Sequence, residues 1–297
     1  MIVVESRGAA PVFFLKIQSA KLHRKIVIPI FLCYNGYKQG MVNRMKHYEK
    51  LLALGCFSKH DIERITGSET AAKWLCQEYL KKGYIERVKR DLYVAISLET
   101  RQSVASRYRI ASRISEDATV SFHSAFEFYG YANQVFYEVQ VTSANRFRDF
   151  DYDGVTYKRI APRITGGIVE SGGVRVTTLE RTVIDCIHLF EKIGGLEEFL
   201  RCVDLIPALD EAALAKCLAE YGSGFLYQKT GYLLSPFAAS LGLSQKFFNL
   251  CKANLPKGKS YLYSNTQGFV WHEQWKLYAP KNPMDLIQKG VTDYDAI

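Results

Sequence analysis

The chain has 297 residues, 48% of them hydrophobic and 23% charged, so it is long enough for two domains and too apolar to be intrinsically disordered. Its formal net charge is +9 and is unevenly placed: residues 1–40 carry +5, residues 41–97 carry +4, and residues 98–297 are neutral, with 22 basic and 22 acidic side chains. A positive end of this kind predicts contact with nucleic acid or another acidic surface.

Residues 1–40 are predicted to be a disordered or non-native leader, with translation starting at Met41. The apolar run 25–34 follows a basic cluster, as in a signal peptide, but Pro29 interrupts it and no small-residue cleavage site follows. The run is also much shorter than the roughly 20 apolar residues of a membrane-spanning helix. An alternative is a short tail that assists contact with DNA or a membrane. We expect a cytoplasmic protein with no membrane partner.

Residues 41–97 are predicted to fold as a winged helix-turn-helix. An amphipathic helix over 43–54 precedes a second helix, 58–67, and a third, 68–83, and both of these start at a capping serine and end at a glycine. The connection between the second and third helices is only two or three residues long, as in a helix-turn-helix. Residues 84–96 alternate between apolar and polar side chains on both sides of a charged turn, which predicts a two-stranded hairpin, the wing.

The third helix and the wing tip, Val88–Asp91, are the predicted DNA-binding surfaces. Lys73 and Gln77 lie one helical turn apart and are expected to face base edges, whereas the basic side chains of the wing are expected to hold phosphates. The predicted set is Ser68, Thr70, Lys73, Gln77, Lys81, Arg87, Lys89 and Arg90. The residues of this helix expected to face the core are Ala71, Ala72, Leu75, Tyr79 and Leu80. Two other interpretations stay open, because winged helices also bind proteins and charge on an exposed strand edge prevents aggregation.

Residues 98–283 are predicted to alternate between helices and strands. The predicted elements are a helix over 98–115, a helix over 120–131 capped by Ser121, a strand over 136–143, a hairpin over 147–160 that turns at Asp153-Gly154, a strand and helix over 172–190, helices at 195–205, 210–221, 225–242 and 244–253, and a β-rich stretch at 260–280.

The order of these elements resembles the AbiEi family of antitoxin regulators from type IV toxin–antitoxin systems. The similarity rests on SFHSAFEFYGY (121–131), G-V-x-Y-K-R-I (154–160), VRVTTLERTVIDCI (174–187), KTGYLLSPFAASLGL (229–243) and W-K-L-Y-x-P-K-N (275–282). It covers roughly residues 44–283. These motifs are packing and turn signatures, and the family has no agreed catalytic residues to carry across.

The resemblance implies a bacterial, cytoplasmic protein with an antitoxin domain over 98–283 and a tail over 284–297. The winged helix would bind inverted repeats in its own promoter and repress the operon. The antitoxin domain would counteract a neighbouring nucleotidyltransferase toxin, in several cases of the family without a stable complex, and would act in abortive infection against phage or in the maintenance of mobile elements. The fold class is then α+β: an N-terminal winged helix-turn-helix followed by a mixed α/β antitoxin domain with a helical C-terminal half.

An enzyme is not expected, and no catalytic, metal-binding or cofactor-binding residues are predicted. Asp149, Asp151 and Asp153 share one face of a strand and could hold Mg²⁺, as in a nuclease or nucleotidyltransferase, but their basic neighbours are typical of a solvated hairpin. His123 is interpreted as a surface residue of a capped helix, because no orienting acid is apparent.

The cysteines and aromatic residues also have ordinary interpretations. Seven cysteines without a C-x-x-C pair predict buried, reduced thiols and no metal site. The aromatic segment 121–139 could line an effector pocket in a transcription factor, but aromatic side chains at this spacing usually form core.

Overall fold

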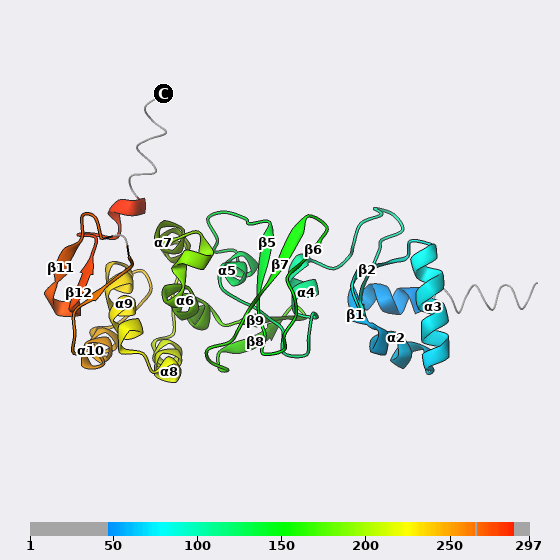
Figure 1. The fold of residues 1–297 in the computed structure, drawn as a ribbon, viewed down its shortest axis with the longest axis horizontal. Coiled ribbons are helices and arrows are strands. Elements are labelled where there is room, and N and C mark those ends of the chain that lie inside the picture. Colours follow the sequence, from blue (N-terminus) through cyan, green and yellow to red (C-terminus); the bar gives the residue numbers. More distant parts are fainter. Residues whose placement is uncertain (1–46, 265, 288–297) are drawn as a thin grey trace, which may run out of the picture. The chain divides into compact units, whose positions relative to one another are not determined.

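The computed structural model describes residues 47–264 and 266–287. The predicted leader, 1–40, and most of the predicted tail therefore lie outside the described residues. The chain divides into two compact units, Met1–Val104 and Ala105–Ile297, and its fold is mixed α/β (Figure 1). Within the described ranges, no helix combines the length and the apolar character needed to span a bilayer.

The first unit combines helices with a three-stranded antiparallel sheet. Its described elements are a helix that includes residues 47–54, β1 (Cys56–Ser58), α2 (Lys59–Thr66), α3 (Glu69–Lys81), β2 (Ile85–Lys89) and β3 (Leu92–Ala95), with strand order β1-β3-β2. Ser58 caps α2 in a capping box with Asp61, and Ser68 caps α3. Gly67 ends α2 with a φ of 78°, a left-handed conformation that glycine adopts without strain. The predicted caps, the glycine stop and the hairpin are confirmed.

The buried face of α3 follows strict helical spacing. Its buried residues are Ala72, Leu75, Cys76 and Tyr79. These positions recur at three and four residues and face the core of the unit. The expectation that Ala71 and Leu80 are buried is wrong, because each lies just outside this stripe and is exposed. Strand β1 was not predicted, because three residues are too few to show alternation.

The second unit begins with a mixed six-stranded sheet. Its elements here are α4 (Arg107–Ala111), β4 (Thr119–Val120), α5 (His123–Tyr129), β5 (Glu138–Thr142), β6 (Phe150–Tyr152), β7 (Val155–Ile160), β8 (Ile168–Ser171) and β9 (Val174–Thr177), in the sheet order β6-β7-β5-β4-β9-β8. The β5–β7 and β4–β9 pairs are parallel, and the other pairs are antiparallel. Helices α4 and α5 lie on opposite sides of β5 (Figure 1).

The second half of this unit is helical and ends in a small sheet. It contains α6 (Leu179–His188), a 3₁₀ turn (Phe190–Ile193), α7 (Leu196–Asp204), α8 (Glu211–Tyr221), α9 (Gly224–Leu234), α10 (Gln245–Ala253), β10 (Ser260–Tyr261), β11 (Val270–His272) and β12 (Leu277–Ala279). One apolar core runs from Phe122 to Ala279. At Gly231 a Cβ would lie 2.1 Å from a ring carbon of Trp275, so this close approach requires glycine.

Three predicted helices are shorter than expected or begin at a different residue. The helix expected over 98–115 is confined to Arg107–Ala111, because the amide of Ser97 bonds to Gln102 and closes a loop before the helix can start. Ser121 does not cap α5, because Phe122 occupies the cap position and the Ser121 hydroxyl instead bonds to Gln140 and Thr142 of β5. The helix expected over 225–242 ends at Leu234, just before Ser235-Pro236, where a 3₁₀ turn replaces it.

Candidate functional site

The exposed side of α3 lies opposite its buried stripe. Thr70, Lys73, Gln77 and Lys81 of the predicted set are all exposed there. Lys73, Gln77 and Lys81 are spaced four residues apart, so they line one side of the helix. Ser68 is exposed too, but its hydroxyl oxygen accepts the amide hydrogen of Ala71 at 3.1 Å and starts the helix.

The acidic side chains of α3 are paired with lysines. Lys59 lies 2.9 Å from Glu69, and Lys82 lies 2.7 Å from Glu78. The hydrogen bond from Lys59 lowers the pKa of Glu69, which therefore stays ionised and paired. Because both acids of the helix are matched in this way, the positive charge of Lys73 and Lys81 is the net charge that α3 presents to solvent.

The hairpin tip is smaller than predicted. Its turn is Arg90-Asp91, with Asp91 at a φ of 61°, whereas Val88 is buried beside an irregularity in the β2–β3 register. The Arg90 side chain is 90% exposed and Arg87 is also exposed. Lys89 is half-buried, and burial lowers its pKa, so it is less available to a phosphate than its two neighbours.

Trp74 was not included in the predicted DNA-binding set. Its side chain is 52% exposed and lies beside Lys73 on the side of α3 that faces away from the core. A large apolar side chain such as Trp74 is seldom exposed on a polar helix face, and exposed apolar residues often mark a contact surface.

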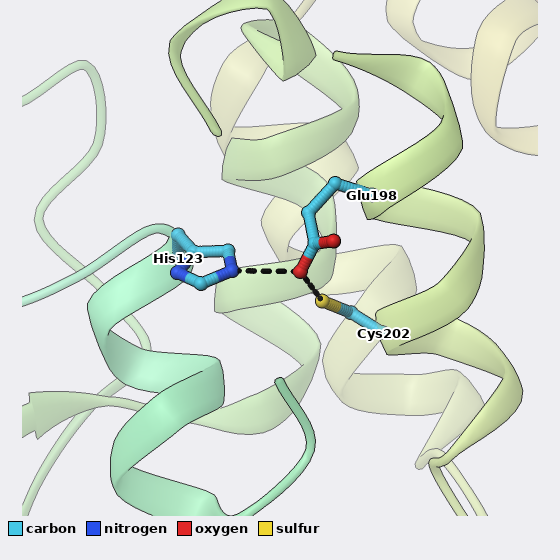
Figure 2. Close-up of side chains that lie close together, drawn as sticks. All are labelled: His123, Glu198 and Cys202. Carbon is cyan, nitrogen blue, oxygen red and sulfur yellow. Dashed lines mark hydrogen bonds and ion pairs between the residues drawn. The ribbon is translucent and has the colours of Figure 1, made fainter. Parts of the chain in front are cut away.

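The second unit contains a buried cluster of ionisable side chains centred on His123. Its side chain is 1% exposed, so the interpretation of His123 as a surface residue is wrong. His123 starts α5, while Glu198 and Cys202 lie one turn apart on α7 (Figure 2). The imidazole Nε2 lies 2.9 Å from Glu198 Oε1, and Nδ1 lies 3.1 Å from Glu127 Oε1. Two orienting acids are therefore present where the sequence showed none.

The two carboxylates are held by further donors. Glu127 accepts hydrogen bonds from the amide of Phe136 at 2.9 Å and the hydroxyl of Tyr108 at 2.8 Å, and it also contacts the Arg107 guanidinium. Burial alone would raise the pKa of Glu127, but the hydrogen bonds from His123, Phe136 and Tyr108 outweigh it and lower the pKa.

Glu198 is held in the same manner from its other side. Its Oε2 accepts from Gln134 at 2.8 Å and from Asn133 at 3.3 Å, and its Oε1 accepts the Cys202 thiol at 3.4 Å. Burial opposes ionisation here too, but the bonds from His123 and the two amides lower the pKa of Glu198. The two carboxylates therefore contact both ring nitrogens of His123, and Glu127 also contacts the Arg107 guanidinium.

The other acids considered for metal binding do not gather. Asp149 accepts the amide of Arg159 at 2.9 Å, and Asp151 accepts the hydroxyl of Thr156 at 2.5 Å. Among the described residues, His123, Glu198 and Cys202 form the one group of three or more His, Cys, Asp or Glu side chains whose ligand atoms all lie within 4.8 Å of one another. The cysteines of the described ranges are buried and form no disulfide, as expected, and Cys33 lies outside those ranges.

The aromatic segment of the second unit is partly core and partly the wall of an open hollow. Phe122 and Phe126 are buried. The ring of Phe136 stacks on His123 with centroids 4.1 Å apart. Phe136 also lines a hollow of about 430 Å³ with Tyr137, Glu138, Thr156, Lys158, Lys192 and Gly194.

Comparison with known proteins gives a fold and no family. No family model matches the chain, and no curated protein matches it. The structure of the RV2827C protein from Mycobacterium tuberculosis is similar, with a TM-score of 0.56 and 14% sequence identity over 80% of this chain and 89% of that chain. This similarity supports the mixed α/β fold.

Proposed function

We propose that this protein is a DNA-binding repressor and the antitoxin of a type IV toxin–antitoxin pair. The first unit would act as a winged helix-turn-helix, with α3 as the recognition helix and the β2–β3 hairpin as the wing. The observation that carries the proposal is the exposed row of Lys73, Gln77 and Lys81 on a helix whose acids are already paired. Arg87 and Arg90 extend the positive charge onto the hairpin.

The two elements would contribute differently to DNA binding. A side chain that contacts base edges contributes to one sequence, whereas a side chain that contacts phosphate contributes to every sequence. We therefore assign specificity to Lys73 and Gln77, with Thr70 beside them. Arg87 and Arg90 are assigned to phosphates, and Lys89 contributes less than its neighbours because it is half-buried.

Binding to two duplexes tests this assignment. Fluorescence anisotropy with the DNA upstream of the protein's own gene, and with a random duplex, is measured at several salt concentrations. Lys73→Ala and Gln77→Ala should each cost about 1–3 kcal/mol on the upstream DNA and much less on the random duplex. Arg90→Ala should weaken both and reduce the salt dependence by about one unit of slope.

The neutral second unit provides a matched control. Lys246 is exposed on α10. Lys246→Ala therefore removes the same charge as Lys73→Ala, but from the unit that does not contain the proposed DNA-binding residues. It should leave binding to both duplexes unchanged. Equal losses for Lys246→Ala and Lys73→Ala, or no preference for the upstream DNA, would contradict the proposal.

The antitoxin role is assigned to the second unit on the family resemblance. It predicts that a gene for a nucleotidyltransferase toxin lies next to this one. When that toxin is expressed from an unrelated promoter, the full chain carrying Lys73→Ala and Arg90→Ala should still protect cells, although it no longer represses. Loss of protection together with loss of DNA binding would show that the two roles are not separable.

A regulator that binds an effector in the second unit is the alternative function. The open hollow beside Phe136 favours it, because Lys158 and Lys192 could meet an anionic ligand. However, Lys158 already contacts Glu138, which reduces the positive charge available there. A thermal melt with added nucleotides separates the two functions, since an effector raises the melting temperature of the second unit.

A further inference from the structure

We propose that His123, Glu198 and Cys202 form a binding site for a single divalent transition-metal ion, with Zn²⁺ the best match. The side chains come from two helices and point toward one another (Figure 2). Nε2 of His123 lies 2.9 Å from Oε1 of Glu198, and Sγ of Cys202 lies 3.4 Å from the same oxygen. All three ligand atoms lie within 4.8 Å of one another, so one ion can reach all of them.

The donor types select the metal. Imidazole nitrogen, thiolate sulfur and carboxylate oxygen are the ligands of Zn²⁺ in proteins, whereas Mg²⁺ and Ca²⁺ take oxygen alone. Glu198 and Cys202 are four residues apart on α7, so both side chains lie on the same face of the helix. Three protein ligands leave one position of a tetrahedral ion for a water molecule.

The surroundings of these three residues match those of known metal ligands. A metal-bound histidine almost always donates its other ring nitrogen to a carboxylate or carbonyl, and Nδ1 of His123 lies 3.1 Å from Glu127. Glu127 is itself fixed by the amide of Phe136 and the hydroxyl of Tyr108. The oxygen of Glu198 that faces away from His123 accepts Gln134 at 2.8 Å. Two of the three proposed ligands, His123 and Glu198, are therefore already oriented by other residues.

Ligation also couples metal binding to proton release. A thiol binds a metal ion as the thiolate, and an imidazole binds through a nitrogen that carries no hydrogen.

The test uses the full, untagged chain with Cys33→Ser, because Cys33 lies outside the described residues and a free thiol there could bind metal adventitiously. After treatment with a chelator and dialysis, Co²⁺ is added as a spectroscopic substitute for Zn²⁺. One equivalent should bind, with thiolate-to-cobalt charge-transfer absorption and tetrahedral d–d bands. Zn²⁺ should displace it, and addition of Zn²⁺ to the metal-free protein should release protons in a weakly buffered solution.

Two cysteine variants decide whether the site is the proposed one. Cys202→Ser keeps the size of the side chain and its hydrogen bond to Glu198 but supplies a poor ligand, and Cys202→Ala is used if it does not fold. Either should weaken Zn²⁺ binding by more than about 100-fold and abolish the charge-transfer band. Cys251→Ser alters another buried thiol, and this variant should keep both the Zn²⁺ affinity and the charge-transfer band. Absence of stoichiometric binding, or binding that survives the loss of Cys202, would overturn the proposal.

Discussion

Asp117 is expected to be the side chain whose loss most clearly shows the pH dependence of the second unit. Its carboxylate accepts hydrogen bonds from Ser115 Oγ at 2.9 Å, Ser143 Oγ at 2.7 Å, the amide of Ala144 at 2.6 Å, and the amide and side chain of Asn145 at 3.3 and 2.8 Å. Partial burial opposes ionisation, but these donors outweigh it and hold the pKa of Asp117 well below its usual range. The substitution Asp117→Asn removes the negative charge. It also replaces one accepting oxygen with an NH₂ group, which cannot accept the hydrogen bonds that the surrounding donors make.

The expected cost follows from the bonds and from the direction of the pKa shift. Hydrogen bonds to a charged group contribute about 1.5–3 kcal/mol each, but they are shared and partly solvated here, so we expect a total of about 2–3 kcal/mol at pH 7. A carboxyl group whose pKa is lowered by folding stabilises above its unfolded pKa, near 3.9, and loses that contribution as the pH falls. At pH 3 the difference between wild type and Asp117→Asn should therefore shrink by about 1.3 kcal/mol.

Urea unfolding followed by tryptophan fluorescence measures this difference. The chain has three tryptophans, and Trp271 and Trp275 lie in the second unit, so a Trp74→Phe background restricts the signal to that unit. Asp153→Asn is the control, because it makes the same chemical change at a left-handed turn position, with φ 51°, that asparagine also accepts. It should change stability by less than about 0.5 kcal/mol at either pH. A loss for Asp117→Asn that is the same at pH 7 and pH 3 would refute the reasoning.

Three further substitutions test the packing of both units. Gly231→Ala should destabilise by about 1–3 kcal/mol or more and alter the near-UV circular dichroism of Trp275, because the new methyl group would overlap the ring. Arg181→Met should cost about 3–5 kcal/mol, since it removes the cation 2.7 Å from the buried Asp185 and leaves that carboxyl group with the Tyr221 hydroxyl as its remaining side-chain donor; replacing Arg181 and Asp185 together with apolar side chains should cost less than this single change. Tyr48→Phe removes a 2.6 Å hydrogen bond to a buried carbonyl and should lower the stability of the first unit, followed through Trp74, by about 1–3 kcal/mol.

Local features of the fold could be predicted because their signals lie within a few residues. The cap of Ser58 and the cap of Ser68 each join atoms three residues apart, so one short segment contains the whole interaction. The turn at Asp153-Gly154 is equally local, since both residues adopt the positive φ that Asp-Gly favours. The exposed row of α3 was also visible, because helical spacing separates Lys73 and Gln77 from the core.

Interactions between distant segments could not be predicted in this way. The sequence offered His123 as one polar residue on an apparently exposed helix, and its partner Glu198 lies 75 positions further along the chain. The same limit applies to the parallel pairing of β5 with β7 and to the burial of Val88 in the β2–β3 hairpin. The sequence by itself determined where helices and turns begin, because capping and backbone conformation depend on neighbouring residues. Only the tertiary structure decided which polar side chains are buried together, because their burial depends on how the helices pack against one another and on the sheet. The spacing of residues within one segment carries no information about that packing.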